Sequence, residues 1–495
     1  MSHCFLCVPG VVVTVTRDPD GYAAGRLKYE PLCYILLRGV SSMEYLTPQK
    51  VAEVTGGEFI GSEGARNARI AGAVRDNREV KPGNLFVCIR GERADGHDFA
   101  ASAYEAGAAC CLAERVLPGA NGPYVLVKSS LDAIKAVGKY HRSRFNIPVI
   151  GITGSVGKTT AKEMTAAALG AKFRVLKTQG NLNNELGVPL TLLALDSEHE
   201  AAVVEMGVSD FGEMSRLADM VRPDICIITK IGYSHLETLG GLEGVLRAKS
   251  EVFAYMKPGG LAIMNGDDEL LRGYDPGLRK TTFGVGPHND FCAKSIVAQG
   301  TEALAFDICS GSGSFSVRIP AYGNHLALAA LAATAAAKQL GMSDGEICGG
   351  LLSYKPVDGR ANPLETGAIT IIDDCYNANP NSVSSALASL SALAGRRVAI
   401  LGDMLDLGGQ SELLHREIGT LAAQGGVDSL ICCGDKAAHI YEAFVSAGGG
   451  DAWRFPAKSE LIAALPELIK KGDAVLIKAS HGMKFEELLP YLKEL

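Results

Sequence analysis

One short stretch of this chain constrains its fold and chemistry more than any other. Residues 149–164 read Val-Ile-Gly-Ile-Thr-Gly-Ser-Val-Gly-Lys-Thr-Thr-Ala-Lys-Glu-Met. An apolar strand runs into a glycine-rich turn, and an alanine-rich helical segment follows directly. Backbone N–H groups of such a turn and the N-terminus of the helix converge on an anion. The stretch therefore predicts a phosphate-binding loop for a nucleoside triphosphate, formed by Gly154, Ser155, Gly157, Lys158, Thr159 and Thr160.

Two side chains of this loop have predicted tasks. Lys158 is expected to reach the β- and γ-phosphates, and the Thr159 hydroxyl is expected to bind Mg²⁺. The spacing departs from the strict Walker pattern, because Ile152 stands five positions before Gly157. An apolar strand followed by Gly-Lys-Thr-Thr still favours a phosphate loop over a chance glycine turn.

Composition bounds the class of protein. A chain of 495 residues is expected to form two to four domains, and 47% hydrophobic with 21% charged residues is ordinary for a soluble α/β protein. The net charge of −7 gives no reason to expect a nucleic-acid partner. Thirteen scattered cysteines in a long chain indicate reduced thiols, so we expect a cytoplasmic protein. No apolar run reaches the roughly 18 residues that a membrane span needs.

A repeated pattern of short apolar strand, polar or glycine residues and helix predicts βαβ units. Such units build parallel sheets with helices on both faces, and ligands gather at the carboxyl ends of the strands. The expected strands are Pro148–Ile152, Ala201–Glu205, Asp224–Thr229, Leu261–Met264, Ile369–Ile372, Arg397–Leu401, Ser429–Cys432 and Ala474–Lys478.

Breaks in the pattern predict an α/β chain of three domains after an N-terminal extension. One break precedes an expected helix at Leu131–Phe145, and a Pro/Gly turn at Tyr354–Gly359 marks another. Near the start, Thr47 and Pro48 are typical of a helix N-terminus, and Gly56 ends that helix. The predicted divisions are residues 1–42, an extension outside the native start at Met43, and domains 43–127, 128–355 and 356–495.

Three further strings carry a resemblance to a known family. They are Gly180–Thr191, Asp373–Pro380 and Leu401–Gly408. With Gly-Lys-Thr-Thr, which alone is shared with folylpolyglutamate synthases, they make the chain resemble the ATP-dependent Mur ligases from about Met43 to the C-terminus. The resemblance implies a smaller N-terminal domain for a UDP-sugar substrate, a central P-loop-type domain and a C-terminal Rossmann-like domain.

The branch of the family that these strings resemble implies a reaction. It joins D-Ala-D-Ala to UDP-N-acetylmuramoyl-tripeptide through an acyl phosphate in peptidoglycan precursor synthesis, using ATP and two Mg²⁺ sites. Thr159, Glu205, His235 and Lys249 then resemble metal ligands, with Lys249 carbamylated, and Arg360 resembles the arginine brought to the γ-phosphate. A carbamate requires a neutral amine, so Lys249 must be buried.

The same resemblance implies the binding residues. For ATP it adds Asn265, Asp267 and His325 to the phosphate loop and Arg360. The UDP-sugar site falls on Asp76, Asn77 and Arg78, where the family usually has Asp-Ser-Arg. The remaining substrate-binding residues are Asn181, Asn183, Asn184, Asp374, Tyr376, Asn377 and Asn379. Asn377–Pro380 is equally compatible with a tight turn held by Asx hydrogen bonds.

Four residues depart from the family pattern: Leu326, Ala329, Ala479 and His481. The first two replace asparagines that contact the nucleotide, so those amide contacts must be absent or replaced. Two other functions stay open at this point: a sister ligase with a different amine substrate, and a P-loop ATPase or switch that forms no amide. We expect a monomer.

Overall fold

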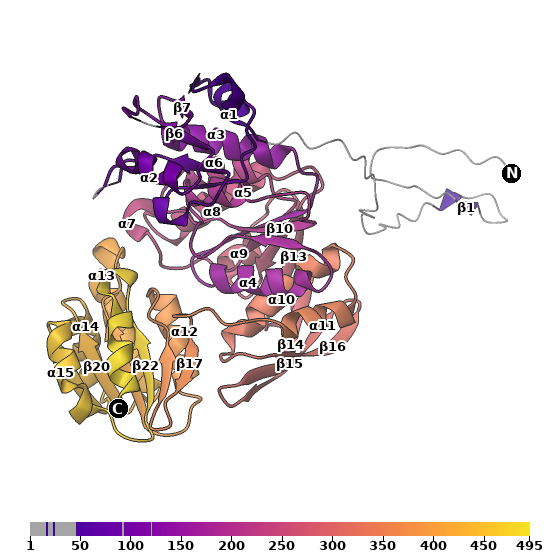
Figure 1. Ribbon diagram of the computed structural model, residues 1–495. Helices are drawn as coiled ribbons and strands as arrows, with labels where there is room; N and C mark the ends of the chain where they lie inside the picture. Colours follow the sequence, from indigo (N-terminus) through magenta and orange to yellow (C-terminus); the bar gives the residue numbers. More distant parts are fainter. Residues whose placement is uncertain (1–15, 18–22, 25–45, 92–93, 120) are drawn as a thin grey trace.

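The computed structural model describes residues 16–17, 23–24, 46–91, 94–119 and 121–495. These residues form three α/β lobes that follow one another along the chain (Figure 1). Of the predicted extension 1–42, only the antiparallel pair β1 (Thr16–Arg17) and β2 (Ala23–Ala24) is described, and Met43 lies outside the described residues.

The N-terminal lobe is built on a five-stranded sheet in the order β3-β7-β6-β5-β4. Only β3 pairs antiparallel. Helix α1 (Pro48–Thr55) begins and ends as predicted, with the Thr47 hydroxyl accepting from Lys50 N and Gly56 in the left-handed conformation. The other elements are β3 (Glu58–Ile60), β4 (Gly72–Val74), β5 (Asn84–Val87), α2 (Ala100–Glu105), β6 (Cys110–Ala113), β7 (Tyr124–Leu126) and α3 (Ser130–Ser143).

The central lobe holds a nine-stranded sheet in the order β16-β15-β14-β13-β12-β11-β8-β10-β9. Its strands are β8 (Val149–Thr153), β9 (Val175–Lys177), β10 (Ala201–Glu205), β11 (Ile225–Ile228), β12 (Leu261–Asn265), β13 (Arg279–Gly284), β14 (Phe291–Gln299), β15 (Ala303–Ser310) and β16 (Gly313–Ile319). Its helices are α4 (Lys158–Gly170), α5 (Gly187–Leu192), α6 (Glu213–Val221), α7 (Leu236–Leu239), α8 (Leu242–Ser250), α9 (Glu269–Gly273), α10 (His325–Gln339) and α11 (Asp344–Leu352).

Alternate residues of β8 divide the central core between the two faces of the sheet. Ile150 and Ile152 pack with α4 and α10, whereas Val149 packs with α5, α6 and α8. Strands β8 to β13 are parallel, which confirms the predicted parallel sheet with helices on both faces.

The antiparallel strands β14 to β16 are a correction to the expectation of strand–helix alternation alone. They form the exposed edge of the central sheet (Figure 1). Their sequence has the period-two alternation of a half-exposed antiparallel strand, as in Ser314-Phe-Ser-Val-Arg-Ile319, with a two-residue turn at 311–312. The signal was present in the sequence, but it is weaker than the continuous apolar runs of the buried strands.

The C-terminal lobe has a six-stranded sheet in the order β17-β18-β22-β19-β20-β21, parallel except at the β17 edge. Its elements are β17 (Asn362–Glu365), β18 (Thr370–Asp373), α12 (Pro380–Leu390), β19 (Arg397–Gly402), α13 (Ser411–Gln424), β20 (Ser429–Cys433), α14 (Ala437–Ser446), β21 (Asp451–Phe455), α15 (Lys458–Leu468), β22 (Ala474–Lys478) and α16 (Leu489–Lys493). The three sheets occupy residues 58–126, 149–319 and 362–478; the exact domain boundaries stay a prediction.

One hydrophobic cluster continues from the central lobe into the C-terminal lobe. It includes Val149 and Met206 of the central lobe together with Val383 and Leu387 of α12. The two lobes therefore share buried apolar surface, which fixes how they face each other. In the described part of the chain, no helix has the length and apolar character needed to cross a membrane.

A buried histidine fixes the segment after β19. His415 Nδ1 donates to Ser411 O at 2.6 Å, and its Nε2 accepts from Met404 N at 3.0 Å. This arrangement requires the neutral ring, and burial lowers the pKa of His415 below its usual value.

We expect His415 to make the C-terminal lobe sensitive to acid. Because its pKa is lowered in the folded state, its contribution to stability is present above about pH 6.5 and is lost below it, where the unfolded chain takes up the proton first. Urea unfolding followed by the fluorescence of Trp453, the single tryptophan, should show a fall in the midpoint between neutral and mildly acidic pH. This fall in the midpoint should be smaller in His415→Gln than in the wild type. The control His481→Gln, which replaces an exposed histidine, should show the same fall as the wild type. An equal fall in His415→Gln would contradict the assignment.

Candidate active site

The phosphate loop is held in place by the segment that follows β11. Gly154 has φ +146°, and a Cβ on it would lie 2.0 Å from Thr229 Oγ1. The same hydroxyl donates to Val156 O at 2.5 Å, and Ser155 N donates to Lys230 O at 2.8 Å. Gly157, with φ +81°, then turns the chain into α4. Glycine is required at 154 because no side chain fits against Thr229.

Polar side chains from three segments meet at the start of α4. Glu205, at the carboxyl end of β10, accepts at Oε1 from Asn183 Nδ2 (2.8 Å) and from Thr159 Oγ1 (3.4 Å). Arg360 Nη2 donates to Thr159 Oγ1 at 3.4 Å from the C-terminal lobe. Lys158 Nζ donates to Gly154 O at 2.8 Å, and its burial lowers its pKa. The site thus gathers two cations around one buried carboxylate.

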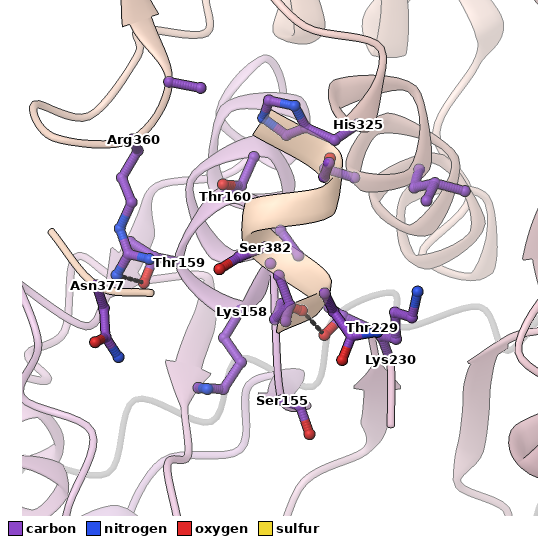
Figure 2. A pocket seen from close by; sticks show the side chains of 18 of the residues that line it. Ser155, Lys158, Thr159, Thr160, Thr229, Lys230, His325, Arg360, Asn377 and Ser382 are labelled. Atoms are coloured by element: carbon purple, nitrogen blue, oxygen red, sulfur yellow. Dashed lines mark hydrogen bonds between the residues drawn. The ribbon is translucent and has the colours of Figure 1, made fainter. Parts of the chain in front are cut away.

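These groups open into a cavity of about 380 Å³ between the central and C-terminal lobes. Figure 2 shows Lys158, Thr159 and Thr160 at the loop, with Arg360, Asn377 and Ser382 brought from the C-terminal lobe. Most of the predicted site residues line this cavity: Ser155, Gly157, Lys158, Thr159, Thr160, Asn181, Asn183, Glu205, Asn265, His325, Arg360, Asp374, Tyr376, Asn377 and Asn379.

The loop after β18 forms the C-terminal wall of the cavity. Lys478 Nζ donates to Asp374 Oδ2 at 2.6 Å and to Asn377 O at 2.9 Å. The Arg360 guanidinium lies 3.9 Å from the centroid of the Tyr376 ring, a cation–π contact. Asn379 caps α12 by accepting from Ser382 N, so the Asx turn and the cavity lining are both present.

Three sequence profiles match the chain lobe by lobe. They describe the Mur ligase family catalytic domain (residues 69–136), the Mur ligase middle domain (residues 152–337) and the Mur ligase glutamate ligase domain (residues 359–481). The chain is also 37% identical over 454 residues to the Bacillus subtilis UDP-N-acetylmuramoyl-tripeptide–D-alanyl-D-alanine ligase, covering 90% of this chain and 98% of the relative.

The chain belongs to the Mur ligase family. The Escherichia coli enzyme with the same name is 35% identical, covering 91% of this chain and 98% of the relative. Among solved structures, MurF from Acinetobacter baumannii superposes with a TM-score of 0.82 at 32% identity, covering 91% and 99% of the two chains. MurF from Thermotoga maritima in complex with ADP has a TM-score of 0.75 at 30% identity, covering 86% and 97%. The family predicted from the sequence strings is confirmed.

Two predicted nucleotide or substrate residues of this Mur ligase have local structural partners outside the cavity. Asn184 Oδ1 accepts from Gly187 N at 2.9 Å at the start of α5. Asp267 accepts from Val285 N and Gly286 N and so fixes the turn after β13. Gly154 is not among the lining residues either, and its close approach to Thr229 shapes the loop.

The predicted UDP-sugar residues lie in the N-terminal lobe and do not line the cavity between the other two lobes. Asp76 caps a short 3₁₀ turn and pairs with the exposed Arg78, which lowers the pKa of Asp76 to about 2. Asn77 Nδ2 donates to Ser102 Oγ at 3.0 Å. Arg78 is therefore an exposed charge, held in place by Asp76.

His235 and Lys249 also lie outside the cavity lining, but they are within electrostatic range of Lys158. The Lys249 side chain is buried and forms no hydrogen bond or ion pair with any described residue. Burial lowers its pKa well below the usual value, and the charge of Lys158 acts in the same direction. Both effects disfavour the charged ammonium at Lys249.

The site has a free ligand for a divalent cation at Glu205. Its Oε2 atom is buried and makes no hydrogen bond within the described residues. No cluster of three or more His, Cys, Asp or Glu side chains able to hold a metal occurs in the described ranges. Mg²⁺ at nucleotide sites takes only one or two carboxylates and completes its shell with phosphate oxygens and water, so Glu205 and Thr159 fit that ion.

Two buried lysines and one asparagine of the site were missed in the sequence. Lys478 supports the Asp374 loop, and Lys162 lies beside Glu205 with a separation of 3.9 Å from Nζ to Oε2. Asn381 Oδ1 accepts from Tyr233 N at 3.1 Å and links the two lobes. A lysine at a strand end or on a helix ordinarily suggests a solvated charge, so little in the sequence pattern indicates these roles.

The four departures from the family pattern have structural places. Leu326 and Ala329 belong to α10 and are buried in the core of the central lobe, and Ala329 also lines the cavity. Ala479 is fully buried against Gly402. His481 N donates to Asn377 Oδ1, and the His481 ring lies 5.4 Å from that of Tyr376. His481 therefore extends the stack that Arg360 begins.

We expect Lys478→Met to destabilise the C-terminal lobe by about 3 kcal/mol, because it leaves the Asp374 carboxylate without its buried counter-ion. The exposed fractions of the two side chains are 2% and 14%. Urea unfolding monitored by Trp453 fluorescence measures the change. The exposed Lys493→Met provides the matched control. Equal stability of the two variants would show that the ion pair does not contribute to the stability of the lobe.

Proposed function

We propose that this chain joins D-Ala-D-Ala to UDP-N-acetylmuramoyl-tripeptide at the expense of ATP, forming an amide bond, ADP and phosphate. One observation carries the proposal: a single cavity is lined from both lobes. The central lobe contributes the phosphate loop, and the C-terminal lobe contributes Arg360 and the Asp374–Asn379 loop. The names of the relatives that match almost their full length support the choice of substrates and a role in peptidoglycan precursor synthesis.

The reaction passes through two displacements. A carboxylate oxygen of the tripeptide attacks the γ-phosphorus of ATP, and the bond from phosphorus to the β,γ-bridging oxygen breaks, giving an acyl phosphate and ADP. The amine of D-Ala-D-Ala then attacks the acyl carbon, phosphate leaves, and the nitrogen loses a proton. Lys158, Arg360 and the N–H groups at the start of α4 stabilise the negative charge that gathers on the transferring group.

Glu205 and Thr159 would hold Mg²⁺, which neutralises phosphate charge when bound. The buried Glu205 Oε2, which makes no hydrogen bond to a described residue, supports this assignment. We assign His235 and Lys249 to a second Mg²⁺, with Lys249 as a carbamate that carries the extra oxygen ligands. The burial of Lys249 and its lowered pKa support the neutral amine that carbamylation requires.

The remaining predicted residues divide between the substrates. We assign Asn265 and His325 to the nucleotide, and Asn181, Asp374, Tyr376, Asn377 and Asn379 to the tripeptide end and the dipeptide. Asp76, Asn77 and Arg78 would bind the UDP-sugar in the N-terminal lobe, with Arg78 exposed for a phosphate. We further propose a cytoplasmic monomer; the described cysteines are all free thiols, in keeping with a reducing compartment.

Phosphate release tests the function directly. The wild-type chain is given ATP and Mg²⁺ with the UDP-tripeptide and D-Ala-D-Ala, separately and together. Release that needs both substrates, with a UDP-pentapeptide product in the mass spectrum, is the expected result. Release without D-Ala-D-Ala dependence would favour a sister ligase or an ATPase that forms no amide.

We expect Lys158→Ala to lower kcat at least about 100-fold, because one cation is lost where charge develops on the phosphoryl group. The control is Lys172→Ala, which removes a partly exposed lysine just beyond the C-terminal end of α4 and should retain wild-type rates. The measurement is phosphate release at saturating substrates. A Lys158→Ala rate near that of the control would refute the assignment of the phosphate loop.

The carbamate has its own test. Lys249→Ala should lose about 10- to 100-fold in rate, the usual cost of disturbing metal ligation. Acetate or formate should restore part of the activity by supplying the missing carboxylate, whereas Lys257→Ala, which removes a half-exposed lysine, should be active and insensitive to these acids. An active Lys249→Ala, or one that no carboxylic acid rescues, would remove the carbamate from the mechanism.

A further inference from the structure

One fully buried cation is not used by the reaction described above. Lys162 lies one helical turn after Lys158 on α4, has no solvent exposure and does not line the nucleotide cavity. Burying an ammonium is costly unless it is paired and hydrogen-bonded. The contacts of this side chain therefore indicate what the charge is for.

The Lys162 ammonium joins three segments behind the metal end of the site. It donates to Gly180 O at 3.2 Å and pairs with Glu163 Oε1 at 3.0 Å. Its third neighbour is Glu205 Oε2, at 3.9 Å. Of the two Glu205 carboxylate oxygens, Oε2 is the one that makes no hydrogen bond to a described residue.

The contact with Gly180 acts on Glu205 from a second side. Gly180 begins the loop that carries Asn183, and Asn183 Nδ2 donates to Glu205 Oε1 at 2.8 Å. The ammonium thus anchors the loop that orients one carboxylate oxygen and lies beside the other. A neutral donor could hold the loop, but only a cation also balances the charge of a buried carboxylate.

We propose that Lys162 is a positioning residue for the divalent cation: it holds Glu205 and the loop of residues 180–184 in the arrangement that receives Mg²⁺. The proposal deepens the proposed function and rests on its assignment of Glu205. Lys162 does not touch the nucleotide, and it acts through Glu205 and Asn183. Its loss should therefore weaken metal binding more than nucleotide binding.

The test is a Mn²⁺ titration of the full chain, followed by electron paramagnetic resonance, with a non-hydrolysable ATP analogue present. In Lys162→Met the Mn²⁺ concentration at half-occupancy should rise about 10- to 100-fold, as for other groups that orient metal ligands. Binding of the analogue in EDTA, which depends on Lys158 and the loop N–H groups, should match that of the wild type.

Two variants separate charge from structure. Lys162→Gln can still donate to Gly180 O but carries no charge, so it should lose Mn²⁺ affinity as Lys162→Met does. Lys177→Met removes the partly exposed lysine that pairs with the same Glu163 and should leave the Mn²⁺ midpoint unchanged.

An unchanged midpoint in Lys162→Met or Lys162→Gln would overturn the proposal. So would a parallel loss of analogue binding in EDTA, or failure of both variants to fold, because either would assign Lys162 to the fold alone. The Mn²⁺ titration measures binding and needs no amide product, so its result is independent of the result of the ligase assay. A wild-type chain that makes no pentapeptide would refute the function without deciding the role of Lys162.

Discussion

The close approach of the Gly154 backbone to Thr229 is the constraint on which the site depends. With a Cβ at 154 only 2.0 Å from the Thr229 hydroxyl, any side chain would push the loop away from the end of β11. Because residue 154 has no side chain, the Thr229 hydroxyl can donate to Val156 O. This hydrogen bond fixes the turn, Lys158 and the start of α4 together. Because β8 lies between β10 and β11, the same turn comes within reach of Glu205.

Charge balance explains why the cavity suits a highly anionic ligand. Lys158 is within electrostatic range of both Arg360 and Lys249, and burial together with this repulsion lowers the pKa values of the two lysines. Glu205 is the carboxylate that opposes the charge of Lys158, and Lys162 already lies beside it. Phosphate groups of a nucleotide would relieve the repulsion among these cations, so ligand binding and the arrangement of the site stabilise each other.

The parts of the site that follow local rules could be predicted from the sequence. The phosphate loop is one continuous string, and the strand-end residues Glu205 and Asn265 follow from the topology of parallel sheets. Asp267 and Asn184 were assigned to ligands by resemblance, yet their carboxylate and amide oxygens fix nearby backbone. Lys162 and Lys478 could not be predicted, because their burial depends on segments far away in the chain.

The placement of the C-terminal lobe depends on α12, which connects the shared core to the site. Val383 and Leu387 of this helix belong to the hydrophobic cluster that continues into the central lobe. At its start, Asn381 Oδ1 accepts from Tyr233 N beside the phosphate-loop support, and near its end Ser389 O accepts from the Tyr322 hydroxyl. The cavity lies along this helix. Apolar burial thus sets the distance between the lobes, and the hydrogen bonds at the two ends of α12 set the register in which Arg360 meets Thr159.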